Sequence, residues 1–272
     1  MGGRALPLGA TAAAVAILVF AAPRPARGQI DYRNLDDDRP TFVEDAYAAE
    51  AYAFEVITPY LLERERDGTF VHASVLELEY GIVRNAHVGI KVPVALRREA
   101  GSNDWGLSGI RVFGLYNFNT ESPLLPAFSL RGDAALPVGS LAGSDARISL
   151  KAIATRSFGR TRIHMNAAYA FGPDGTPAVV ESLPRWWVGV AADRTFFRES
   201  ILVIGEVYVL REEDDARVEV NVSAGLRYQW RPTTVIDVGV ARGLREDLGP
   251  DYALTVGITN AFAIAVLMAG IR

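Results

Sequence analysis

The sequence predicts an all-β fold, namely an antiparallel, transmembrane up-and-down β-barrel of about twelve strands. Three observations predict it. Apolar and polar residues alternate in segments of roughly ten residues between positions 51 and 262, turn residues close each segment, and no long apolar run follows the N-terminus. The clearest alternation covers residues 86–97, where every second residue is apolar. A period of two turns one face of a strand toward apolar surroundings and the other toward polar ones.

The N-terminal 28 residues have the three parts of a signal peptide. Arg4 gives a positive start, residues 8–22 an apolar core, and Ala26-Arg27-Gly28 a cleavage site of mostly small residues. The core is shorter than the roughly 18 residues that a helical span needs, so we expect cleavage, with a retained membrane anchor as the alternative.

The rest of the chain divides into three parts. Residues 29–48 are acidic and lack strand periodicity, and we expect an acidic periplasmic lead-in that is tucked into the barrel mouth or disordered. Residues 49–262 form the predicted barrel, and residues 263–272 a C-terminal tail.

Composition excludes several classes of protein. The chain has no cysteine, which rules out a disulfide-stapled fold, a lipoprotein anchor and a thiolate metal site. Its net charge is −4 with mixed signs, so no basic surface indicates a nucleic-acid partner. The expected partners are outer-membrane lipid and a small-molecule solute, without a cofactor, and the oligomeric state is left open.

The order of strands and connections supports the barrel. The predicted strands cover residues 50–63, 69–83, 86–98, 104–118, 125–138, 145–157, 161–172, 185–195, 200–211, 216–230, 233–243 and 251–262. Connections after even-numbered strands are tight, as at 83–85, 158–160 and 231–233, whereas those after odd-numbered strands are more polar and often longer. Transmembrane barrels sort their connections in this way, with short turns on the periplasmic side.

Aromatic pairs fit the two membrane interfaces. Trp186 and Trp187 begin a predicted strand, and Phe196 and Phe197 end it about one tilted crossing later. We interpret the first pair as part of the outer aromatic girdle, with an interaction site as the alternative, and the second pair as part of the inner girdle.

Strand parity selects the residues that line the lumen. The predicted selectivity residues are Arg111, Arg131, Asp133, Arg147, Lys151, Arg162, His164, Glu206, Arg217, Glu219, Arg227 and Asp237. The basic members concentrate on the fourth to seventh strands and the acidic members on the ninth to eleventh. Opposed walls of this kind orient dipolar solutes and select ions. The alternative is that these charges pair across a packed lumen and close it.

Catalytic and metal-binding patterns are weak. His72 and Ser74 share one face of a strand, as a hydrolase of membrane lipid would need, but the nearby Glu77 and Glu79 have the opposite parity. His87 is expected at a rim, and no histidine has a ligand partner at usable spacing. The sequence therefore predicts neither an enzyme nor a metal site.

Short motifs resemble one family of barrels. Residues 79–82 (EYGI), 106–111 (GLSGIR), 135–139 (ALPVG) and 257–262 (GITNAF) resemble the strand motifs of outer-membrane proteins named for the MetA pathway of phenol degradation. The chain departs from that pattern at Gly109, at Asn260 and in the ten residues that follow Phe262. The resemblance implies a Gram-negative outer-membrane channel or transporter for small hydrophobic or aromatic compounds. A non-transporting structural barrel, a lipid-modifying enzyme and a soluble periplasmic β-protein are the alternatives.

Overall fold

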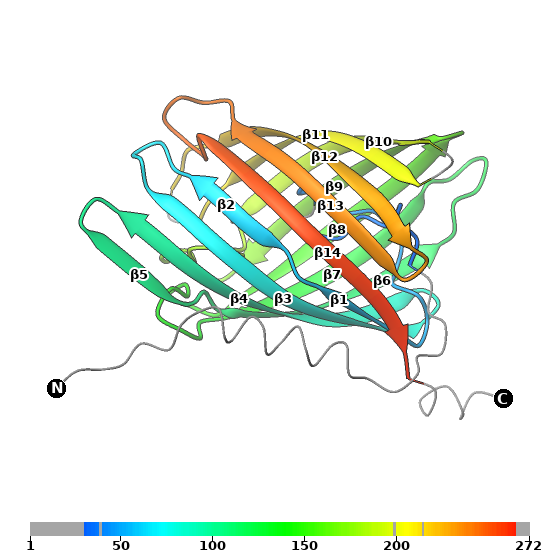
Figure 1. Cartoon of the computed structure of the whole chain (residues 1–272), viewed down its shortest axis with the longest axis horizontal. Coiled ribbons are helices and arrows are strands. Elements are labelled where there is room, and N and C mark those ends of the chain that lie inside the picture. The colour runs from blue at the N-terminus through cyan, green and yellow to red at the C-terminus, as the bar shows by residue number, and fades with distance from the viewer. Residues whose placement is uncertain (1–29, 38–39, 198–199, 214, 265–272) are drawn as a thin grey trace.

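The computed structural model describes residues 30–37, 40–197, 200–213 and 215–264, and the predicted signal peptide and most of the predicted tail lie outside these ranges. Strands dominate the described chain (Figure 1). Their bounds are β1 Ala53–Ile57, β2 Tyr60–Arg64, β3 Phe70–Val83, β4 Ala86–Glu99, β5 Ser102–Leu107, β6 Ile110–Asn119, β7 Ala127–Leu136, β8 Arg147–Phe158, β9 Thr161–Phe171, β10 Trp186–Phe196, β11 Ile201–Arg211, β12 Glu219–Arg231, β13 Thr234–Gly243 and β14 Tyr252–Ala263. In this part of the chain no helix is long and apolar enough to cross a membrane.

The described strand segments close into an antiparallel barrel of twelve strands. The segments β1 and β2 form one barrel strand, because both pair with β3 and with β14, which closes the sheet. The segments β5 and β6 form another, because both pair with β4. Closure leaves no free sheet edge around most of the wall, so backbone groups there are satisfied without water. The predicted fold class is confirmed, and the predicted strand ends agree within about three residues.

Connections differ between the two ends of the barrel, as predicted. Chain segments 84–85, 120–126, 159–160, 197–200 and 232–233 join the strands at one end, here called the tight-turn end. Segments 65–69, 100–101, 137–146, 172–185, 212–218 and 244–251 join them at the other, here called the long-loop end. One long loop, 172–185, folds inward, and its Val180 amide donates to the Ser108 hydroxyl at 2.9 Å, in the break between β5 and β6.

Side chains alternate across the wall. On β9, Ile163, Met165 and Tyr169 are exposed on the outer face, while Arg162 and His164 are buried inside. The same pattern runs around the barrel, so the outer face is a continuous apolar surface and the lumen is polar and charged. An apolar surface of this extent is the surface that a transmembrane barrel presents to lipid.

The chain before β1 lies inside the barrel. Residues 30–50, of which 38 and 39 are not described, run through the lumen and are here called the lumen segment. Ile30, Leu35, Val43 and Ala46 of this segment are at most 2 % exposed, because they pack against inward-facing residues of the wall. The described residues of the predicted acidic lead-in therefore lie within the barrel.

Candidate functional site

A ladder of basic side chains crosses four neighbouring strands of the wall. Lys91 on β4, Arg111 on β6, Arg131 on β7 and Lys151 on β8 all point into the lumen and are buried. Register explains the ladder, because Lys91 lies opposite Arg111 and Arg131 lies opposite Lys151 in adjacent strands. Cations this close are tolerated in a buried setting only when anions compensate them.

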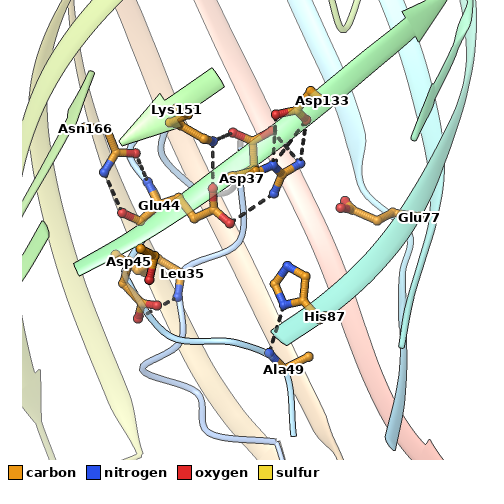
Figure 2. A network of polar contacts seen from close by, with 12 residues as sticks. Leu35, Asp37, Glu44, Asp45, Ala49, Glu77, His87, Asp133, Lys151 and Asn166 are labelled. Atoms are coloured by element: carbon orange, nitrogen blue, oxygen red, sulfur yellow. Dashed lines mark hydrogen bonds and ion pairs between the residues drawn. The ribbon is translucent and has the colours of Figure 1, made fainter. Parts of the chain in front are cut away.

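Carboxylates of the lumen segment compensate the ladder. Asp37 contacts all four ladder cations, with Lys91 Nζ at 3.2 Å and Arg131 Nη2 at 3.3 Å from its Oδ2. Glu44 adds contacts of 3.0 Å to Arg131 and 2.7 Å to Lys151 (Figure 2). Burial alone would raise the pKa of Asp37, but the four surrounding cations outweigh it and hold that pKa well below its usual range.

Three acids of the barrel itself also face the ladder. Asp133 lies beside Arg131 at 3.1 Å, and Glu77 on β3 lies 3.7 Å from Lys91. Glu181, in the inward-folded loop, lies 3.0 Å from Arg111 and 3.4 Å from Lys91. The ladder is thus covered from the lumen by the lumen segment and from the long-loop end by Glu181.

Side chains of the wall also bind the backbone of the lumen segment. Glu206 accepts the Phe42 and Val43 amides at 2.6 and 2.7 Å. Asn166 exchanges two hydrogen bonds with Glu44, accepting its amide at 2.9 Å and donating to its carbonyl at 2.8 Å. Further along, Thr155 accepts the Ala46 amide at 2.9 Å and His87 Nδ1 accepts the Ala49 amide at 3.0 Å (Figure 2). These contacts satisfy backbone groups that have no partner strand in the sheet.

Glycines of the wall make room for this segment. A Cβ atom on Gly239 would lie 2.1 Å from the Pro40 carbonyl oxygen, and one on Gly189 would lie 2.8 Å from Val43 Cγ2. At Gly239 only glycine lets the backbone of the lumen segment approach the wall so closely, and at Gly189 the missing side chain makes room for the valine side chain at position 43.

Eleven of the twelve predicted lumen residues face the interior. Arg162 binds Asp45 of the lumen segment at 3.1 Å and Asp193 of β10 at 2.6 Å, and Arg227 binds Asp36 at 2.9 Å. His164 lies between Thr155 and Asp193, at 3.0 and 2.9 Å. Arg147 holds Glu213 and the Pro173 carbonyl at the long-loop end. The remaining inward-facing residues are Arg111, Arg131, Asp133, Lys151, Glu206, Glu219 and Asp237.

Arg217 is the exception. It lies in the loop before β12 with its side chain 53 % exposed, paired with Asp215 at 2.6 Å. The hydrogen bond from Arg217 lowers the pKa of Asp215 to about 2. The inward position predicted for Arg217 is wrong, because the strand begins at Glu219 and parity does not extend into the loop.

Two further expectations need correction. Trp187 is buried inside, with its ring centroid 4.6 Å from that of Phe42, so it does not belong to an outer girdle. His87, expected at a rim, is buried at the lumen segment. The predicted parity of β3, by contrast, is observed. His72 and Ser74 share the outer face, where His72 Nδ1 is bonded to the Tyr60 hydroxyl at 2.7 Å, while Glu77 and Glu79 are buried inside. The geometry assembles no triad there.

Sequence reasoning missed the partners of the ladder. It selected the wall residues by parity but did not assign the acids Asp36, Asp37, Glu44 and Asp45 to them, because a segment without periodicity carries no signal of where it packs. Strand parity places Gly189 and Gly239 on the inner face, and these two glycines could have indicated that another chain segment packs closely against the wall there.

Among the described residues, no group of three or more histidine, aspartate or glutamate side chains could hold a metal ion.

Two cavities lie on either side of the lumen segment. A cavity of about 870 Å³ opens at the tight-turn end, between Ile30 to Asn34 and the strand ends around Arg160 and Arg231. A cavity of about 710 Å³ opens at the long-loop end, above Pro40, Thr41 and Phe42. Described residues of the lumen segment lie between the two cavities.

Comparisons with known proteins show the fold. No family model matches the chain, and no curated protein matches it. Among solved structures, the KdgM porin aligns with a TM-score of 0.54 at 12% identity, over 76% of this chain and 99% of that chain. The COG4313 outer membrane channel from Pseudomonas putida F1 aligns with a TM-score of 0.58 at 10% identity, over 84% and 100%. The fold is that of outer-membrane β-barrel channels. The more specific phenol-degradation family is not confirmed.

Proposed function

We propose that this protein is a Gram-negative outer-membrane channel for small molecules, and that the lumen segment closes it in the conformation described above. Its outer face would contact outer-membrane lipid, and its tight-turn end would face the periplasm, as in other outer-membrane barrels. No cofactor is needed, because passage through a lumen requires only a polar path and charges that select the solute.

One observation carries this proposal: the lumen is occupied by a separate segment of the chain, and not mainly by side chains that project from the wall. Apart from isolated bridge residues at Asp36 and at Ala51, directly after the segment, the described residues before β1 belong to no strand. Side-chain hydrogen bonds and ion pairs hold it instead. Contacts of this kind can be broken one by one without opening the sheet, whereas a lumen filled by wall side chains could not be emptied.

Lining residues support a solute with an apolar or aromatic body. The cavity at the long-loop end is bordered by Phe42, Leu61, Val75, Val179 and Tyr208. The structure of the KdgM porin has been solved in complex with oligogalacturonate, a polar solute, but that porin is only 15% identical in sequence to this chain. The proposed solute class therefore rests on the lining of this cavity alone.

A reversible disulfide bond that holds the lumen segment against the wall tests the proposal. Because the chain has no native cysteine, Val43→Cys with Gly189→Cys creates a single disulfide between the lumen segment and β10. Planar bilayer recordings should show brief openings for the wild type and the reduced double variant, and none for the oxidised one. Val43→Cys alone, with and without oxidant, is the matched control.

Two results would overturn the proposal. If the oxidised double variant conducts as well as the reduced one, the lumen segment does not close the channel. If neither the wild type nor a correctly folded chain lacking residues 30–50 produces discrete currents, the protein is not a channel.

A further inference from the structure

The two cavities differ in charge. Eight carboxylate side chains and two arginines line the cavity at the long-loop end. Three carboxylates and four arginines line the cavity at the tight-turn end. A concave site lined by one sign of charge raises the local concentration of the opposite ion. The long-loop cavity is therefore a place where cations collect.

Register shows how the wall builds this cavity. Glu63 on β2 lies opposite Ala253 on β14, Ala253 lies opposite Ala241 on β13, Ala241 opposite Ser223 on β12, and Ser223 opposite Glu206 on β11. This row places three small residues between two carboxylates on the inner face. The small side chains leave the space, and the carboxylates border it.

Two of the lining carboxylates form no close ion pair, although the charges of Arg66 and Arg217 act on Glu219 from further away. Neither Glu63 nor Glu219 forms an ion pair with any described residue. Arg66, which also lines the cavity, donates to the carbonyl oxygens of Gly243 and Leu248 at 2.7 and 3.2 Å. Arg97, the other lining arginine, lies 3.0 Å from Glu99 and 3.8 Å from Glu65. The arginines of the cavity are thus engaged elsewhere.

Polar atoms of the cavity wall are left without a partner. The Asn221 amide oxygen and the Thr41 hydroxyl find no hydrogen-bond partner among the described residues, although Asn221 is only 1 % and Thr41 only 3 % exposed. Unmet acceptors in a buried setting are costly unless a ligand or water supplies a donor. They complement a ligand that carries N–H or polarised C–H groups.

The floor of the cavity is aromatic. Phe42 is half-buried and lines the cavity, and its ring is stacked on that of Tyr208, with centroids 4.6 Å apart and planes 19° apart. Aromatic rings attract cations through their faces and also receive apolar groups. Because no carboxylates of the described residues converge into a group that could hold a metal ion, the arrangement suits a diffuse charge on an organic body.

We propose that the long-loop cavity binds small organic cations with an aromatic or apolar body, such as aromatic amines and quaternary ammonium compounds. The charged group would lie between Glu63 and Glu219, and the body would rest on Phe42. This inference rests on the proposed channel function and names the solute class that the outer cavity admits.

Binding to the purified full chain in detergent tests it without requiring conductance. Isothermal titration at pH 8 would compare benzyltrimethylammonium with tetramethylammonium, benzoate and benzyl alcohol. We expect benzyltrimethylammonium to bind tightest, since it alone has both the charge and the ring. Glu63→Gln and Glu219→Gln should each weaken it by about tenfold, and Phe42→Leu by roughly threefold.

The control is Glu246→Gln, which removes an exposed acid of the same end that does not line the cavity, and it should leave the affinity unchanged. Tighter binding of benzoate, equal affinity for the two ammonium ions, or equal effects of Glu63→Gln and Glu246→Gln would each overturn the inference. If the bilayer recordings show a gated channel while benzyltrimethylammonium does not bind, the channel function stands and this inference fails.

Discussion

Asp36 and Asp37 are adjacent in the sequence but bind opposite walls of the barrel. Asp36 lies 2.9 Å from Arg227 on β12, whereas Asp37 meets Lys91, Arg111, Arg131 and Lys151 on β4 to β8. The two carboxylates thus span the lumen at one level and tie the lumen segment to both sides. Removing one of them should loosen the segment without altering the sheet.

The substitution Asp37→Asn should open the channel. Four buried cations would lose their shared anion, and breaking one side of a buried ion network costs about 3 kcal/mol or more. This cost destabilises the conformation in which the lumen segment occupies the lumen, here called the seated state. Bilayer recordings should therefore show a much higher open probability. Asp31→Asn is the control, because Asp31 forms only an exposed pair with Arg33. An unchanged open probability in Asp37→Asn would contradict the assigned role of Asp37.

The pH dependence should follow from the low pKa of Asp37. A carboxyl whose pKa is depressed in the seated state stabilises that state above its ordinary pKa, and the contribution is lost as the pH falls through the depressed value. Mild acid should therefore leave the channel closed, and opening should begin only below the usual aspartate range. Recordings between pH 7 and pH 3 check this. Opening at pH 5 to 6 would show that another group controls the segment.

The architecture was predictable from the sequence because period-two alternation and turn chemistry are local signals. Lumen residues such as Arg131 and Lys151 followed from parity within strands, and Arg217 failed where the strand had already ended. The position of the lumen segment was not predictable. Its ion pairs join residues far apart in the chain, for example Asp37 with Lys151, and no local pattern encodes them. Trp187 was misassigned because an aromatic residue near a strand end fits both a girdle and a packed lumen.

The glycine at position 239 should be required for seating the lumen segment. In Gly239→Ala the new methyl group would meet the Pro40 carbonyl oxygen, which is backbone and cannot rotate away. Overpacking of this kind costs about 1–3 kcal/mol, which corresponds to a decrease of about fivefold to about 150-fold in the equilibrium constant for seating the segment. Val43→Cys reports it, since its alkylation by a maleimide should accelerate when the segment leaves the wall. Gly205→Ala, on the exposed outer face with space around it, should leave the alkylation rate unchanged.

The closed sheet should resist detergent. The described strands pair around the barrel and leave a free sheet edge only at β5, so unboiled protein should keep its barrel in SDS and migrate differently from boiled protein. A gel of the outer-membrane fraction, run with and without boiling, measures this. Absence of a mobility shift, with the protein recovered in the soluble periplasmic fraction, would contradict a membrane barrel.

The basic ladder should set anion preference once the lumen segment has left it. In a chain lacking residues 30–50, Arg111 and Arg131 would face solvent beside Lys91 and Lys151, and their field would favour anions on that side of the lumen. Arg111→Ala together with Arg131→Ala should move the reversal potential in a KCl gradient toward cation preference. Arg194→Ala, on the outer face of β10, is the matched control. An unchanged reversal potential in conducting double-variant channels would mean that ions avoid the ladder and follow the wall that carries Glu206 and Asp237.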